Sequence, residues 1–113
     1  MPYINTITNV SITKEQEERI KTRMGEDIRL LNKTEEYLMV NMQDNNRLYF
    51  RGDTENPNAF VEVRLYGKAT SQAYDQMTAA ITKIIEEELH IPGNNIYVQY
   101  EEVPHWGLNG ENF

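Results

Sequence analysis

The spacing of hydrophobic positions predicts a strand, a helix and a second strand in the first part of the chain. Residues 3–9 alternate and are rich in Ile and Thr, as in a half-buried strand. Thr13 with Gln16 three residues later is a capping-box pattern, which predicts the start of a helix. Asn32 is suited to a left-handed helix stop, and residues 37–43 predict the next strand. The apolar stripe of the helix has three- and four-residue spacing: Ile20, Met24, Ile28 and Leu31.

The same order of elements returns in the second half. Residues 60–66 and 96–101 predict two more strands, with a helix between them. The two halves are separated by a polar turn, a short extended piece at residues 47–50 and a loop at residues 52–58. The sequence of the tail, residues 103–113, predicts irregular structure. The second helix has its own apolar stripe: Tyr74, Met77, Ile81, Ile84, Ile85 and Leu89.

The repetition predicts an internal duplication. Residues 38–42 align with residues 96–100, and the two helix stripes align at nearly the same offset. Parallel strands joined by a helix cross over right-handed, which places both helices on one face of the sheet. We therefore expect one α+β domain over residues 1–113: a duplicated β-α-β unit with a four-stranded sheet built mainly of parallel pairs.

Two helices cannot cover both faces of this sheet. Alternation assigns a mixed set with three large side chains to the second face. We expect a partner subunit to cover this face, the alternative being a two-layer protein whose sheet is solvated on one side. The set is Met39, Asn41, Glu62, Arg64, Tyr66, Tyr97 and Gln99.

Charge and composition exclude several classes of function. Eleven Lys and Arg against 18 Asp and Glu give a formal charge of −7, which argues against nucleic acid as a partner. The absence of cysteine excludes disulfides, a thiol nucleophile and a cysteine zinc site, and His90 and His105 lack the spacing of metal ligands. No apolar segment is long enough to span a membrane, and the first ten residues lack a secretory pattern, so we expect a cytoplasmic protein. The acidic run at residues 86–88 predicts a solvated helix face.

Pro2 is the first candidate for chemistry. A small second residue generally permits removal of the initiator methionine, which would leave proline with a free secondary amine. A free α-amino group titrates near ~8, and burial or a nearby lysine lowers its pKa toward the range of a general base. The alternative is an ordinary proline at position 2. While Met1 is attached, the Pro2 nitrogen is an amide and cannot act as a base.

Other candidates each have a structural alternative. Lys33 follows the first helix and either binds the last helix carbonyls or holds a substrate carboxylate. Tyr97 and Gln99 point the same way from the last strand, so they either pack on the covered face or line a pocket at a subunit boundary. Trp106 is one of the few large aromatic residues of the tail, and its simplest role is to anchor the tail to the core.

The ordered set of features resembles the tautomerase superfamily, in its macrophage migration inhibitory factor branch, over the whole chain. The resemblance rests on Met1-Pro2 leading into a strand, on the doubled strand-helix-strand pattern and on four local motifs. Residues 32–40 resemble the lysine followed by a strand, and residues 65–68 the Ser-Ile-Gly-Lys turn. Residues 95–100 resemble the Val-Tyr-Ile-Asn-Tyr strand, and residues 107–113 the Gly-Trp-Asn-Gly-Ser-Thr-Phe ending.

The resemblance implies a homotrimer around a central channel, with active sites at the subunit interfaces. It implies a cofactor-independent tautomerase that interconverts keto and enol forms of a small α-keto acid, of the phenylpyruvate type. Pro2 would be the general acid/base, and Lys33 would bind the carboxylate. The pocket would be completed by Tyr66, with its backbone amide, by Trp106 and Leu108 of the tail, and by Tyr97 and Gln99 of a neighbouring subunit.

Two alternatives remain open on the sequence. One is a trimeric, cytokine-like interaction module with a vestigial pocket. The other is a related proline-based reaction such as decarboxylation or dehalogenation, for which Arg64 and Glu62 are the additional charged candidates.

Three departures from the family pattern affect the pocket. Gln99 replaces an Asn, Tyr66 replaces an Ile, and Leu108 replaces a Trp while Trp106 lies two residues earlier. They bear on substrate preference more than on the chemistry of the proline.

Overall fold

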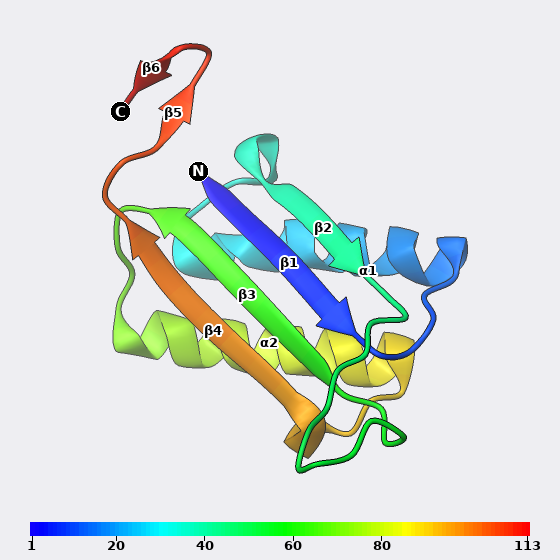
Figure 1. Ribbon diagram of the computed structural model, residues 1–113. Helices are drawn as coiled ribbons and strands as arrows, with labels where there is room; N and C mark the ends of the chain where they lie inside the picture. The colour runs from blue at the N-terminus through cyan, green and yellow to red at the C-terminus, as the bar shows by residue number, and fades with distance from the viewer.

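The computed structural model describes all 113 residues as two layers, a mixed sheet covered on one face by two helices (Figure 1). The order of the main elements is β1 (Pro2–Thr8), α1 (Lys14–Asp27), β2 (Met39–Gln43), β3 (Ala59–Tyr66), α2 (Ser71–Leu89) and β4 (Ile96–Val103). Short 3-10 turns occupy Ile28–Leu31, Glu35–Tyr37 and Gly93–Asn95, and the chain ends in β5 (Gly107–Leu108) and β6 (Glu111–Asn112).

The sheet has the order β2-β1-β3-β4. β1 is parallel to β2 and β3 is parallel to β4, while β1 and β3 run antiparallel at the centre. The two strand-helix-strand halves therefore meet along β1 and β3, and both helices lie behind the sheet in Figure 1. This confirms the predicted α+β fold with two parallel strand pairs.

The core lies between the helices and the sheet. Ile4, Val61 and Val63 point from the sheet toward the helices and are fully buried. The predicted helix stripes supply the other side of the core, and their fully buried members include Ile20, Met24, Ile28, Met77, Ile81, Ile84 and Ile85. Because both stripes face the same layer, the helical periodicity of the sequence fixes how each helix is rotated on the sheet.

The predicted helix signals are confirmed, and three boundaries need correction. Thr13 and Gln16 form the reciprocal capping box, and Asn32 takes a left-handed conformation with φ 61°. The second strand begins at Met39, because residues 35–37 form a 3-10 turn. Residues 47–50 contribute only an isolated bridge, and the tail contains the β5–β6 hairpin rather than wholly irregular structure.

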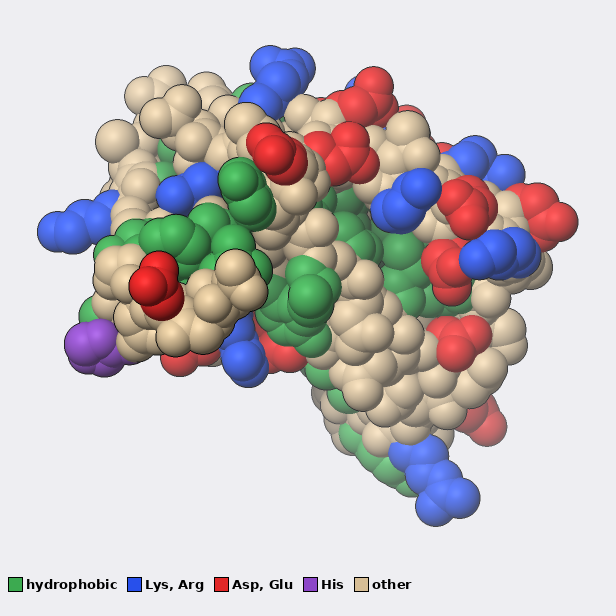
Figure 2. Space-filling model, turned by 90° about the horizontal axis from the view of Figure 1, so that it is seen from above, with side chains coloured by type: hydrophobic (Ala, Val, Ile, Leu, Met, Phe, Trp, Pro, Cys, Tyr) green, Lys and Arg blue, Asp and Glu red, His purple; other side chains and the backbone are tan.

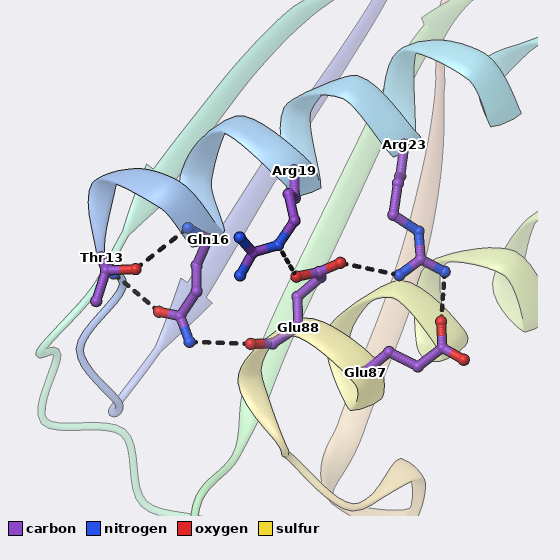
Figure 3. Close-up of polar contacts among 6 residues, drawn as sticks. All are labelled: Thr13, Gln16, Arg19, Arg23, Glu87 and Glu88. Atoms are coloured by element: carbon purple, nitrogen blue, oxygen red, sulfur yellow. Dashed lines mark hydrogen bonds and ion pairs between the residues drawn. The ribbon is translucent and has the colours of Figure 1, made fainter.

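A polar network joins the two helices (Figure 3). Glu88 on α2 binds Arg19 Nε at 2.6 Å and Arg23 Nη1 at 3.2 Å, and Glu87 binds Arg23 Nη2 at 2.6 Å. Gln16, which closes the capping box, also donates to the Glu88 backbone carbonyl at 3.0 Å. The expectation of a solvated acidic face is therefore wrong for Glu88, whose side chain is only 12% exposed.

The second face of the sheet is open. Met39 is 67% exposed and Tyr97 is 58% exposed there. At its centre the buried Asn5 donates to Glu62 and Gln43, at 2.9 Å each, and accepts a hydrogen bond from Asn41. This face thus combines exposed large side chains with a row of satisfied polar groups. Neither helix is long and apolar enough to cross a membrane.

Candidate active site

A cavity of about 490 Å³ lies at the end of the sheet where β1 begins. Pro2 forms part of its wall, together with Tyr37 before β2 and Arg64 on β3. The tail contributes Trp106 and Leu108 to the same wall. Viewed from this end of the molecule, hydrophobic side chains gather around the tail (Figure 2). The structure thus brings together three of the predicted site residues, Pro2, Trp106 and Leu108, in one largely apolar cavity.

Pro2 owes its position to the central place of β1. It is the first residue of that strand, is buried, and lies opposite Leu65 on β3. A proline is tolerated at a strand start because its missing N–H removes no internal ladder bond. β3 pairs with Pro2 itself and β2 pairs with the next residue, Tyr3, so the sheet fixes the position of the Pro2 nitrogen.

The chain start is held against the end of β3. The Met1 carbonyl oxygen accepts a hydrogen bond from the backbone N–H of Tyr66 at 3.0 Å. The pKa of the Met1 α-amino group is lowered, first by burial and second by the positive charge of Lys33. An amine at this place is therefore pushed toward its neutral, basic form at physiological pH.

Lys33 reaches this region from the turn after α1. Its Nζ donates to the Tyr66 carbonyl at 2.8 Å, so it binds the end of β3 and not the carbonyls that end its own helix. While Met1 forms part of the wall of the Pro2 cavity, Lys33 does not line that wall; it lies next to it, close enough for its charge to act on the Met1 amine. Gly67, at φ 95°, turns the chain directly beside the Lys33 ammonium. Lys33 thus affects the start of the chain in two ways. Its charge lowers the pKa of the Met1 amine, and its hydrogen bond holds Tyr66, whose N–H binds the Met1 carbonyl.

Tyr66 links the tail to this end of the sheet. Its ring packs on the ring of Phe113, with centroids 5.7 Å apart, and the Phe113 backbone N–H donates to the Trp106 carbonyl at 3.0 Å. The β5–β6 hairpin is therefore anchored next to the cavity that Trp106 and Leu108 line. The tail adopts this position through contacts distant in sequence, which local patterning does not reveal.

Tyr97 and Gln99 lie elsewhere within the chain. They occupy β4 on the open face and are both exposed. The Tyr97 ring packs on Phe50 at 5.2 Å and on Phe60 at 6.3 Å. Neither residue lines the Pro2 cavity of its own chain. The predicted placement of Tyr97 and Gln99 at this cavity would therefore need a neighbouring copy of the chain.

The cavity includes residues to which the sequence assigned no place in the tautomerase pocket. Tyr3, Tyr37, Met39 and Arg64 all line it. The signal for Arg64 was its position two residues before Tyr66 on one strand, which puts both on the same face. No group of three or more His, Asp or Glu side chains gathers in a way that could hold a metal ion.

Comparison with known proteins identifies the family of the chain. The family model described as macrophage migration inhibitory factor (MIF) matches residues 1–113. The chain belongs to this family. The resemblance found in the sequence, to the MIF branch of the tautomerase superfamily, is confirmed.

Several solved MIF structures share the fold over nearly their whole length. The structure of Leishmania major MIF2 is 33% identical, with a TM-score of 0.93, over 100% of this chain and 97% of that one. The MIF homologue from Prochlorococcus marinus is 30% identical, with a TM-score of 0.89, over 98% of each chain. The MIF structure from Toxoplasma gondii is 24% identical, with a TM-score of 0.90, over 98% of this chain and 99% of that one. At this identity it supports the fold alone. A search of curated proteins found no match.

Proposed function

We propose that this MIF-family chain is a cofactor-independent keto–enol tautomerase of the phenylpyruvate type, with the amine of Pro2 as its general acid/base. The observation that carries the proposal is the setting of the chain start. Pro2 is buried on the wall of the cavity, and the adjacent amine has its pKa lowered by burial and by Lys33. Once Met1 is removed, the same two influences act on the secondary amine of Pro2.

The proton transfer needs only residues of the site. The neutral Pro2 nitrogen takes a proton from one position of the substrate and returns it to another, so no atoms are gained or lost. Lys33 pairs with the substrate carboxylate, and its charge favours the neutral amine. Tyr37, Trp106 and Leu108 offer apolar surface to the rest of the substrate.

The position of the Met1 carbonyl suggests where a substrate oxygen binds. That carbonyl accepts a hydrogen bond from the Tyr66 N–H. Removal of Met1 leaves this donor without its partner beside the Pro2 amine. An oxygen of the substrate can then accept from Tyr66, and a backbone donor in a fixed sheet is preorganised to hold it.

The proposed assembly is a homotrimer in which the open face of each sheet meets its neighbours. The exposed Met39 and Tyr97 are large enough to favour burial on this face. A neighbouring copy would place its Tyr97 and Gln99 at the Pro2 cavity, where they can hydrogen-bond the enol oxygen as charge develops. Sedimentation would test the assembly directly.

The enzymatic test follows the ultraviolet absorbance of enol-phenylpyruvate as it ketonises, with the state of Met1 read from intact mass. Pro2→Gly keeps an amine but loosens it, so its rate should fall. Equal rates for the parent, Pro2→Ala and Pro2→Gly proteins would exclude the proposed role of Pro2. Retained Met1 together with no turnover would favour the interaction module with a vestigial pocket.

A further inference from the structure

Arg64 is the one charged side chain on the wall of the Pro2 cavity. It extends from β3 on the open face, and its guanidinium carbon lies 5.8 Å from the ring centre of Tyr3. Most of the wall is aromatic or aliphatic, including Tyr37 and Trp106. A cation on such a wall has a strong influence on which substrates enter, since little else there is charged.

The N–H donors of the Arg64 guanidinium are free to bind a ligand. Its ion pairs with Glu101 at 3.5 Å and Glu62 at 3.7 Å are both long, and it donates no hydrogen bond within the chain. By contrast, Arg19 binds its carboxylate partner at 2.6 Å. A guanidinium presents five donors in a planar fork that fits a carboxylate in bidentate geometry.

The two acidic neighbours do not block this capacity. Glu62 already accepts a hydrogen bond from Asn5 at 2.9 Å, which holds its carboxylate toward the centre of the sheet. Glu101 is exposed, and neither carboxylate forms part of the cavity wall. An anion in the cavity would therefore meet the Arg64 cation before it meets either carboxylate.

We propose that Arg64 makes this site selective for substrates with a second anionic group, such as a dicarboxylate α-keto acid. The inference rests on the proposed function, in which Lys33 and the Tyr66 amide hold the first carboxylate and the reacting oxygen. Arg64 then binds the far end of the substrate. The proton transfer itself is unchanged, and Arg64 takes no proton.

Three substrates with one skeleton test the inference: phenylpyruvate, its para-carboxy derivative and its para-carbamoyl derivative. The last two have nearly the same shape and differ in charge. The parent protein should prefer the para-carboxy over the para-carbamoyl compound in kcat/KM by about tenfold, the size of one charge-assisted hydrogen bond. In Arg64→Gln this ratio should fall close to one, and Arg64→Lys should keep part of it. Arg47→Gln, an exposed arginine in the loop after β2, is the matched control and should keep the full ratio.

A binding measurement separates this inference from the proposed function. Calorimetry with the unreactive para-carboxycinnamate and para-carbamoylcinnamate needs no turnover. If no substrate reacts, the tautomerase proposal fails, yet a preference for the diacid that disappears in Arg64→Gln still supports the role of Arg64. The inference is overturned if Arg64→Gln leaves the preference intact in both measurements, or if the parent shows none. It is also overturned if Arg64→Gln weakens all ligands equally while lowering the thermal midpoint, which would mark Arg64 as structural.

Discussion

The carbonyl oxygen of Met1 lies 3.0 Å from the backbone nitrogen of Tyr66 and accepts its hydrogen bond. This single contact places the first peptide of the chain where the proposed substrate would bind. It also means that Met1 has two effects while it is present: it turns the Pro2 nitrogen into an amide, and it occupies the Tyr66 donor. Removal of one residue would therefore create the base and vacate the oxygen site together.

Protein with a blocked N-terminus should be inactive. An uncleaved N-terminal extension keeps the Pro2 nitrogen an amide, so we expect loss of enol-phenylpyruvate turnover with an unchanged fold. The measurement is the rate of preparations whose N-terminus has been defined by intact mass, with far-ultraviolet circular dichroism as the control. Full turnover by the extended protein would contradict the proposed chemistry.

Loss of Lys33 should affect both binding and pH dependence. The positive charge of Lys33 lowers the pKa of the amine at the chain start, so Lys33→Ala should raise the pKa of the Pro2 amine. Because the neutral amine is the base, the rise of kcat/KM with pH should move to higher pH. We also expect KM to increase by about tenfold or more through the lost carboxylate contact.

Lys83→Ala provides the control for this variant, since Lys83 is exposed on α2. Its pH profile and KM should equal those of the parent. A pH profile that is identical in the parent and Lys33→Ala would show that Lys33 does not tune the amine.

Gly67→Ala should impair substrate binding as well as stability. Gly67 has φ 95°, a conformation that strains alanine by about 1 kcal/mol. Relief of this strain would shift the Tyr66 carbonyl, which holds Lys33 at 2.8 Å, so KM should rise. Gly52, at φ 77° with open space around it, is the matched control. Gly52→Ala should lose similar stability in urea unfolding with an unchanged KM, and equal KM values in both variants would contradict the assigned geometry.

The network between the helices should make stability depend on acidic pH. Hydrogen bonding to Arg19, and then to Arg23, lowers the pKa of Glu88 below its ordinary value. The folded pKa is thus below the unfolded value of about 4.3, so this stabilisation is fully present above pH ~4.3 and is lost as the pH falls through the folded value. Glu88→Gln should reduce the free energy of unfolding by about 1 kcal/mol at pH 7 and flatten its decline in acid.

Glu26→Gln is a suitable comparison, because Glu26 is exposed on α1 and makes no ion pair. The free energy of unfolding, measured with urea between pH 7 and pH 3, should fall with pH as steeply in this variant as in the parent. If the free energy of unfolding of Glu88→Gln changed with pH in parallel with that of the parent, the proposed contribution of the Glu88 ion pairs would be excluded.

The regular elements were largely predictable because their signals are local. The stripe that contains Ile20 and Met24 has the helical period, and Thr13 with Gln16 forms the cap that its sequence predicted. Residues 35–37 and the tail were harder, since their conformations depend on distant contacts such as that of Phe113 with Tyr66. The same holds for Arg64, whose place in the cavity depends on the tail folding over the end of the sheet.

The sequence alone determined the number and type of the main elements, the face that each strand presents to the helices, and the presence of a proline at position 2. Periodicity carries this information, because a side chain's face follows from its place along its own strand or helix. The tertiary structure decided which faces meet. Pairing of β1 with β3 sets Pro2 opposite Leu65 and brings Met1, Lys33 and Tyr66 together, although they are far apart in the chain. Such contacts depend on the packing of whole elements, for which no local stretch of sequence holds a signal.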